Sequence, residues 1–320
     1  MSIMKRLAAA WLAAVSCAAA AQSYPSKPVR IVVPFAPGGN LDVTARLVAD
    51  SMSKTLGQPF VIENKAGAGG AVGQEAVARA APDGYTLVAA TTGTTIVSPL
   101  MIPDPPYSRA DFACVGIMAV TPLILEVPAA SPYRDFKSYL AAVRANPGKV
   151  SIGHSGNGTT NHIAILQLQD VLKVQFNIVP YKGSGPALVD LVGGQIDSMM
   201  DQTSSSLPQI RAGKLRALAV GTPQRLADLP DVPSLQEEGA KDFEAATPSA
   251  LLAPAKTPPE VVRVLNAALN KALADPAVRA KLKDLGSEIR ETTPAQLDRF
   301  MRDEERKLKV LHEKGVLKGG

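Results

Sequence analysis

The chain has 320 residues, and its 34 lysines and arginines outnumber its 29 aspartates and glutamates, which gives a formal charge of +5 at pH 7. This length is enough for two domains of ordinary size. No dense stripe of lysine and arginine with interleaved aromatic residues occurs, so the composition argues against a nucleic-acid partner.

Residues 1–21 have the composition of a secretory signal peptide. Two positive charges precede an apolar stretch that ends in small residues, and cleavage is expected near Ala21. Removal of this segment leaves 299 residues, a formal charge of +3 and Cys114 as the single cysteine, so no intramolecular disulfide can form. The alternative is a lipoprotein-type site at Cys17, which lacks the usual preceding leucine. We therefore expect export to the periplasm.

The segment 29–57 predicts a strand, a loop and a helix in succession. Val29–Val33 is a short apolar run with the β-branched residues of a buried parallel strand. The loop that follows contains two prolines and two glycines, and Asn40 is expected to cap the next helix. Apolar residues recur at helical spacing up to Leu56, and Gly57 supplies a stop. Free N–H groups in such a loop would form a site for an anion.

Strands and helices continue to alternate after this unit. Pro59–Glu63 and Tyr85–Ala90 predict strands, and the segment 71–80 between them predicts a helix. This alternation indicates parallel βαβ units. Phe112–Val127 differs, because it is nearly continuously apolar and too long for one ordinary strand. We expect this segment to complete one domain and to enter the next.

The remainder of the chain predicts a second α/β region and a helical tail. In chain order we expect a helix at 135–145, a strand at 149–153, a helix ending near Leu172, a strand at 176–180, a helix ending at Val192, a strand at 196–200, a short helix before Gly213, a strand at 215–220, a second crossing segment at 243–252 and helices at 258–274, 276–285 and 294–312. The predicted fold class is therefore α/β with two domains. Domain 1 comprises residues 23–122 and 247–320, and domain 2 comprises residues 123–246.

Three loops in these domains share one design. Ala36–Asn40, His154–Thr160 and Tyr181–Gly185 each lie between the end of a predicted strand and the start of a helix. Ligands of open α/β sheets bind at the carboxyl ends of strands, so loops from both domains would face each other across a cleft. The alternative is that strand-to-helix turns contain glycine for conformational reasons alone. Because the three loops are spread over both domains, the pattern favours a binding site.

Ser155 raises the alternative of a secreted α/β hydrolase. The sequence at 153–157 approaches the nucleophile elbow G-x-S-x-G, but Asn157 replaces its last glycine. A hydrolase of this order also requires a later aspartate and then a histidine, and only His162 and His312 follow. Neither position favours a triad. Ser155 is explained more simply as a donor to a ligand oxygen or as a helix cap.

Cofactor and metal sites are not supported by the remaining motifs. The glycines of Gly67–Gly73 are spaced G-x-G-G-x-x-G, which departs from the dinucleotide fingerprint, and close helix–strand packing explains them. The histidines and the cysteine are scattered without ligand spacing, so no metal is expected. Asp201 ends a predicted strand, where it can either receive a ligand ammonium group or cap the following turn.

Short motifs along nearly the whole mature chain carry a family resemblance. In order, they are YPSKP at 24–28, PFAPGG at 34–39 followed by Asp42 and Arg46, ENKAGAGG at 63–70, PDGYTL at 82–87, NPG at 146–148, PYKG at 180–183 and GGQID at 193–197. Together they resemble the extracytoplasmic solute receptors of tripartite tricarboxylate transporters, also called the Bordetella uptake gene (Bug) family.

This resemblance implies a fold, a function and a set of site residues. The fold is that of a two-domain periplasmic binding protein of the Venus-flytrap, type II-like kind, with two chain crossovers at the hinge. The function is to hold a small organic carboxylate between two strand-to-helix loops, largely through backbone amides, and to deliver it to membrane permease subunits without catalysis or a cofactor. The expected ligand-binding residues are Phe35, Ala36, Gly38, Gly39, Asn40, Asp42, Thr91, Thr92, Ser155, Gly156, Asn157, Gly158, Thr159, Tyr181, Gly183 and Asp201.

Leu41 departs from the family pattern, because many members have a small hydroxylated residue at this position. The substitution makes one edge of the expected pocket more apolar.

We expect a monomer whose lobes hinge near Thr121–Pro122 and Ala246–Pro248. A third hypothesis is a periplasmic sensor that binds the same ligand but contacts a signalling protein, which the sequence does not separate from a transport receptor.

Overall fold

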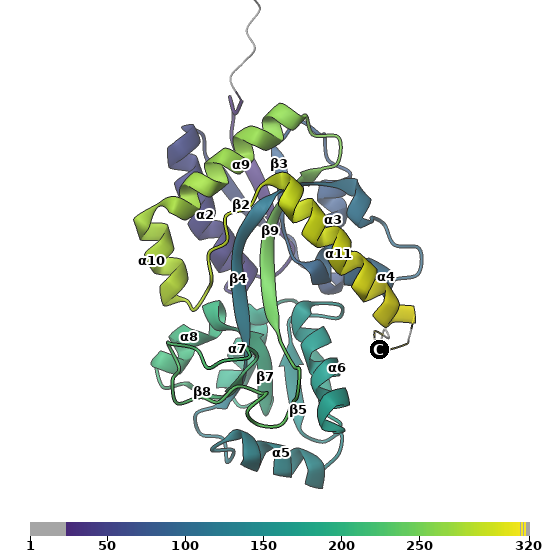
Figure 1. Ribbon diagram of the computed structural model, residues 1–320, viewed down its shortest axis with the longest axis vertical. Helices are drawn as coiled ribbons and strands as arrows, with labels where there is room; N and C mark the ends of the chain where they lie inside the picture. The colour runs from purple at the N-terminus through teal and green to yellow at the C-terminus, as the bar shows by residue number, and fades with distance from the viewer. Residues whose placement is uncertain (1–23, 314, 316, 318–320) are drawn as a thin grey trace, which may run out of the picture.

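Two long strands, β4 (Phe112–Pro128) and β9 (Ala246–Pro254), run through the middle of the molecule and connect its two lobes (Figure 1). The computed structural model describes residues 24–313, 315 and 317. The predicted signal peptide lies outside these residues. Within the described part of the chain, no helix combines the length and the apolar character that are needed to cross a membrane.

The first lobe, in the upper half of Figure 1, contains parallel strands beside β9. Alternate residues of its first strand face opposite sides, so that Ile31 and Val33 enter one apolar cluster and Val32 enters another. Because helices cover both faces, the strand is apolar apart from the exposed Arg30, as the sequence predicts. The elements are β1 (Val29–Val33), β2 (Phe60–Asn64) and β3 (Thr86–Ala90), with α2 (Asn40–Leu56), α9 (Pro259–Ala274) and α10 (Pro276–Asp284) on one face, and α3 (Ala71–Ala78) and α11 (Pro294–Glu313) on the other.

The second lobe, in the lower half of Figure 1, repeats the α/β pattern around its own apolar cluster. Phe136 and Tyr139 are among its largest fully buried side chains. The strands are β5 (Ser151–His154), β6 (Asn177–Pro180), β7 (Ser198–Gln202) and β8 (Leu215–Val220), and the helices are α5 (Phe136–Ala145), α6 (Thr160–Leu172), α7 (Ser184–Val192) and α8 (Thr203–Arg211).

The sheet passes from one lobe to the other along β4. Its order is β2-β1-β3-β9-β4-β7-β5-β6, and β8 also pairs with β4. β4 pairs with β9 as far as Pro122 opposite Ala246, and with β7 from Leu123 opposite Gln202. The long apolar segment is thus a single strand of 17 residues, whose register shifts twice before Val120.

Several elements differ from the sequence predictions. Asn40 is the first residue of α2 rather than its cap, and Gly39 occupies the cap position without a side-chain bond. β7 begins two residues later than predicted, because Asp197 lies in the preceding turn and accepts hydrogen bonds from the N–H and hydroxyl of Ser151. After β3 the chain forms a π-helix, η2 (Gly93–Val97), and the short helix α4 (Ser98–Leu100), neither of which the sequence predicts.

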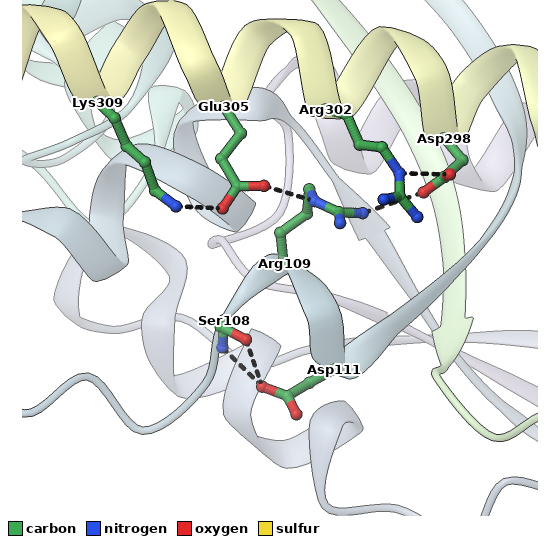
Figure 2. A network of polar contacts seen from close by, with 7 residues as sticks. All are labelled: Ser108, Arg109, Asp111, Asp298, Arg302, Glu305 and Lys309. Carbon is green, nitrogen blue, oxygen red and sulfur yellow. Dashed lines mark hydrogen bonds and ion pairs between the residues drawn. The ribbon is translucent and has the colours of Figure 1, made fainter.

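A network of ion pairs fastens α11 to the first lobe (Figure 2). Arg109, in the short helix η3 (Arg109–Asp111), donates to Glu305 at 2.7 Å and to Asp298 at 3.0 Å. Arg302 donates to the second oxygen of Asp298 at 2.8 Å, and Lys309 pairs with Glu305 at 2.9 Å. Arg109 is the most buried of these charges, and its ion pairs connect α11 to η3, which directly precedes β4.

Candidate functional site

A small cavity lies between the lobes, where the loops that precede α2 and α6 face each other. Its volume is about 20 Å³, which is room for about one water molecule. Both lobes and strand β9 contribute to its wall. The lining residues are Phe35, Gly39, Asn40, Leu41, Asp42, Thr91, Ser155, Thr159, Thr160, Asn161, Ser184, Gln202 and Thr247.

Asp42, in the first turn of α2, holds the loop between β1 and α2. Gly38 has a φ of 89°, in the left-handed region that favours glycine, and its N–H donates to Asp42 Oδ2 at 3.0 Å. Arg46 Nε donates to both carboxylate oxygens at 3.0 Å, and Asn64 Nδ2 donates to Oδ1 at 2.9 Å. Asn64 also donates to the carbonyl of Phe35 at 3.0 Å. One carboxylate and its partners therefore fix both ends of the loop.

The charge of Asp42 is engaged by these partners. Burial by itself raises the pKa of Asp42, but the hydrogen bonds from Arg46, Gly38 and Asn64 outweigh this effect and hold the pKa below its usual value. Asp42 is thus ionised at neutral pH and already paired. It is poorly placed to receive an ammonium group from a ligand.

The loop between β5 and α6 is held by two buried histidines and a threonine. The rings of His154 and His162 stack, with centroids 4.6 Å apart and an interplanar angle of 15°. His154 Nδ1 accepts a hydrogen bond from Gly156 N–H at 3.1 Å, and His162 Nδ1 accepts one from Gly158 N–H at 3.2 Å. Thr159 caps α6 with its hydroxyl oxygen, which accepts from His162 N–H. Neutral groups therefore hold this loop.

Both imidazoles are uncharged at neutral pH. Burial lowers the pKa of His154 to about 3, and the neighbouring His162 acts in the same direction. Burial also lowers the pKa of His162. A proton on either Nδ1 would convert an acceptor of a loop N–H group into a donor, so protonation and the observed loop conformation exclude each other.

A polar network behind the cavity joins α6 to β7 and β9. Ser155 Oγ donates to Asn161 Oδ1 at 2.9 Å, and Asn161 Nδ2 donates to Asp201 Oδ1 at 3.1 Å. Gln202 Nε2 donates to Asn161 Oδ1 and to Thr247 Oγ1, both at 2.9 Å. The wall of the cavity thus continues from the second lobe into the strand that connects the lobes.

Asp201 lies behind this wall and is fully buried. The hydroxyls of Ser184 and Ser205 donate to its two carboxylate oxygens at 2.5 Å. Burial raises the pKa of Asp201, and burial together with the charge of Asp201 raises the pKa of Glu126 well above its usual value. Ser206 joins the two carboxyl groups, donating to Glu126 at 2.8 Å. Asp201 reaches the cavity only through residues such as Ser184, which it holds in position.

The structure separates the predicted site residues into groups. Those that line the cavity are Phe35, Gly39, Asn40, Asp42, Thr91, Ser155 and Thr159. Gly156, Asn157 and Tyr181 line a neighbouring hollow of about 400 Å³, and Gly38 lines another of about 570 Å³. The predicted residues that line none of these three spaces are Ala36, Thr92, Gly158, Gly183 and Asp201.

Several polar residues of the wall are not among the expected ligand-binding residues. Thr160 and Ser184 lie within two of the predicted loops, whereas Asn161, Gln202 and Thr247 lie outside these loops. Each has a hydroxyl or amide side chain and lies at the start of a helix, at the end of a strand or in the second crossing segment. The available signal for Thr160, Asn161 and Ser184 was their position in or directly after the predicted loops, and that for Gln202 was its position next to Asp201. Leu41, which the sequence marks as a departure from the family pattern, also lines the cavity.

The lining offers backbone N–H groups, hydroxyls and amides, but among the lining residues that the structure describes there is no lysine or arginine. An anion in the cavity would therefore be held by the N-termini of α2 and α6 and by hydroxyl donors. Ser155 Oγ donates to an amide oxygen, which is not a base, and the Nδ1 atoms of His154 and His162 accept from backbone amides. This arrangement does not activate Ser155 as a nucleophile.

The two lobes touch each other around the cavity. Ala36 N–H donates to the carbonyl of Lys182 at 3.0 Å, and Ser204 Oγ donates to Asn40 Oδ1 at 2.7 Å. Ile163 of α6 packs into an apolar cluster of the first lobe. The lobes are thus closed on each other, and a molecule of several carbon atoms can enter only if they separate.

Comparison with known proteins identifies a receptor family and related folds. The family model of the tripartite tricarboxylate transporter family receptor matches residues 44–317. The chain is 35% identical to protein BugT of Bordetella pertussis over 307 residues, or 95% of this chain and 94% of BugT. Its fold is similar to that of MatC from Rhodopseudomonas palustris with bound malate, with a TM-score of 0.85, 36% identity, and coverage of 90% of this chain and 99% of MatC. A second R. palustris protein, whose structure contains adipate, gives a TM-score of 0.88, 32% identity, and coverage of 92% and 100%. The predicted periplasmic-binding-protein fold is confirmed.

Proposed function

Because the chain belongs to the receptor family of tripartite tricarboxylate transporters, we propose that it binds a small carboxylate between its lobes in the periplasm and delivers it to the membrane subunits of such a transporter. The cavity carries this proposal, because two helix N-termini and hydroxyl groups from both lobes surround it. Charge-assisted hydrogen bonds from such groups hold a carboxylate without a cationic side chain. The similar proteins with malate and adipate support the same ligand class.

The residues that line the cavity are the proposed ligand contacts, with the first turns of α2 and α6 holding the carboxylate. The predicted residues Gly156, Asn157 and Tyr181, which line the neighbouring hollow, would meet the far end of a longer ligand. Asp42 and Asp201 act as positioning residues, because hydrogen bonds already occupy their carboxylates. Leu41 gives one edge of the site an apolar surface.

The proposed lobes comprise residues 23–122 with 247–320, and residues 123–246. The change of partner along β4 between Pro122 and Leu123 supports this division. Bending of β4 and β9 at this level would open the cavity, as in the hinge closure of other two-lobed binding proteins.

The receptor would work as a monomer and would release its ligand chemically unchanged. Its leader would be removed near Ala21, and the mass of the protein extracted from the periplasm tests this cleavage, with a chain that begins at Gln22 as the expected result. A lipid-modified chain that begins at Cys17 in the membrane fraction would contradict it.

Ligand binding is tested with malate, adipate, citrate, glutamate and benzoate, by calorimetry and by the shift of the thermal unfolding midpoint. We expect at least one of these acids to bind saturably, to raise the midpoint and to be recovered unchanged by mass spectrometry. A matched Ser155→Ala protein should show the same absence of turnover. If no acid binds, or if an acid or its ester is consumed at a rate that depends on Ser155, the proposal is wrong.

A further inference from the structure

Glycines line the seam where the two lobes meet, and several of them lie outside the cavity. A Cβ atom added at Gly69 of the first lobe would overlap the carbonyl oxygen of Asn157 in the second. One added at Gly158 would lie 3.0 Å from Ser98 Cα in the first lobe, and one added at Gly183 would lie 3.1 Å from Phe35 Cβ. The lobes therefore approach each other backbone to backbone.

Conformation alone explains some of these glycines. Gly69, Gly158 and Gly183 have φ angles of 61°, 77° and 123°, which residues other than glycine rarely adopt. Gly93 and Gly185 differ, because neither has a positive φ. Their backbone would accept alanine, so a different reason for glycine is needed at these two positions.

The opposite lobe supplies that reason. A Cβ at Gly93, in the first lobe, would lie 2.8 Å from the carbonyl oxygen of Gly158 and 2.9 Å from the backbone nitrogen of Thr160. A Cβ at Gly185, in the second lobe, would overlap the carbonyl oxygen of Pro37. Because both obstacles are backbone atoms beside the two binding loops, no rotation of a side chain can relieve them.

Glycine is also an unfavourable residue for the helix that contains Gly185. Gly185 is the second residue of α7, where alanine has a higher helix propensity. Neither Gly93 nor Gly185 lines the cavity. Glycine at these positions, outside the cavity lining and at Gly185 unfavourable for its own helix, is explained by contact between the lobes.

We propose that Gly93 and Gly185 are closure positions, one on each lobe, whose missing side chains allow the lobes to shut around the ligand. The proposal rests on the proposed function as a two-lobed receptor. A ligand that contacts both lobes binds more tightly to the closed form of the protein than to the open form, and this difference in affinity drives closure. Substitution at either position would therefore weaken binding without removing any group that touches the ligand.

The test compares Gly93→Ala and Gly185→Ala with wild type, and uses Gly193→Ala as the matched control. Gly193 lies at the end of the same helix as Gly185, has a φ of −77°, and its added Cβ would meet only backbone and side-chain atoms of its own lobe. The probe is whichever acid of the panel above binds wild type most tightly. Affinity is measured by calorimetry, dissociation by stopped flow, and compaction by small-angle X-ray scattering.

We expect both seam variants to keep the unfolding midpoint of the ligand-free protein, to bind the probe at least tenfold more weakly through faster dissociation, and to show a smaller decrease in radius of gyration on binding. The control should match wild type in all three measurements. If wild type binds the probe and the seam variants bind and compact equally well, the closure positions are refuted while the receptor function stands. If wild type binds no acid of the panel, the receptor function itself fails.

Discussion

The two loops that face each other across the cavity have the same plan but are stabilised by different chemistry. Each follows a parallel strand and leads into a helix. The first is held by an ionised carboxylate, Asp42, with Arg46 and Asn64 as its donors. The second is held by the neutral rings of His154 and His162.

Because of this difference, we expect the first loop to respond to salt and the second loop to respond to pH. The ion pair of the first loop involves Arg46, whose side chain is half exposed, so salt and solvent weaken it. The imidazoles of the second loop are buried and lose their acceptor atoms when protonated. Substitutions and pH can therefore perturb one loop at a time.

Among the single substitutions, the largest effect is expected from Asp42→Ala. The change leaves the N–H of Gly38 and one amide hydrogen of Asn64 without an acceptor and Arg46 without its carboxylate, so we expect a loss of about 2–3 kcal/mol in the free energy of unfolding. Urea unfolding measures this loss, and probe binding should weaken at least tenfold because the loop is no longer held.

The control for Asp42→Ala lies on the same helix. Asp50 and Lys54 form an exposed pair with the same i,i+4 spacing as Asp42 and Arg46. Asp50→Ala should leave the urea midpoint and probe affinity unchanged. Equal effects of the two substitutions would show that a generic helix pair, rather than support of the loop, explains the result.

Asn40 illustrates which parts of the molecule could be predicted from the sequence. The strand, loop and helix around it follow from apolar spacing and from the prolines and glycines, and their bounds agree closely with the structure. The expectation that Asn40 caps the helix was wrong, because its amide donates to Ser249 and accepts from Ser204, which are 209 and 164 residues away in sequence. Local preference cannot reveal contacts that form only when distant strands and the second lobe meet.

Part of the cavity wall was missed for the same reason. Asn161, Gln202 and Thr247 belong to separate elements and converge only through the order of the sheet. The motifs of the family located the loops, whereas the network behind them depends on pairings such as that of β7 with β4. The π-helix after β3 has no sequence pattern that distinguishes it from an α-helix.

The second prediction concerns pH. The folded pKa of His154, about 3, and that of His162 lie below the unfolded value of about 6.5, so below pH 6.5 the unfolded chain binds protons that the folded chain does not. Stability should therefore fall as pH decreases, by about 1.4 kcal/mol per pH unit for each histidine that stays neutral. Urea unfolding between pH 7.5 and about 4.5 measures this slope.

The control is the double variant His154→Asn and His162→Asn, in which an amide oxygen can replace each Nδ1 acceptor without titrating. Its stability should fall less steeply with decreasing pH than that of wild type. Burial raises the pKa of Glu126 and Asp201, so protonation of these two groups increases the stability of the folded protein as pH falls. This contribution is the same in wild type and in the variant, and it cancels from the comparison. Parallel pH profiles would show that the imidazoles do not control the second loop.

The smallest effect is expected from Arg46→Lys, which retains the charge beside Asp42 but removes the planar fork. Arg46 donates from Nε to both oxygens of Asp42 and from its terminal nitrogen to Asn64 at 2.8 Å, and a lysine ammonium cannot reproduce this geometry. Because the side chain is half exposed, we expect a loss of only about 0.5 kcal/mol in the free energy of unfolding and a two- to threefold weaker probe affinity. The loss should shrink in 1 M salt, since screening weakens the stronger ion pair of wild type more than the weaker pair of the variant, whereas the pH slope attributed to the second loop should be unchanged by the substitution. A change in that slope would mean that the two loops are coupled through the closed seam rather than held independently.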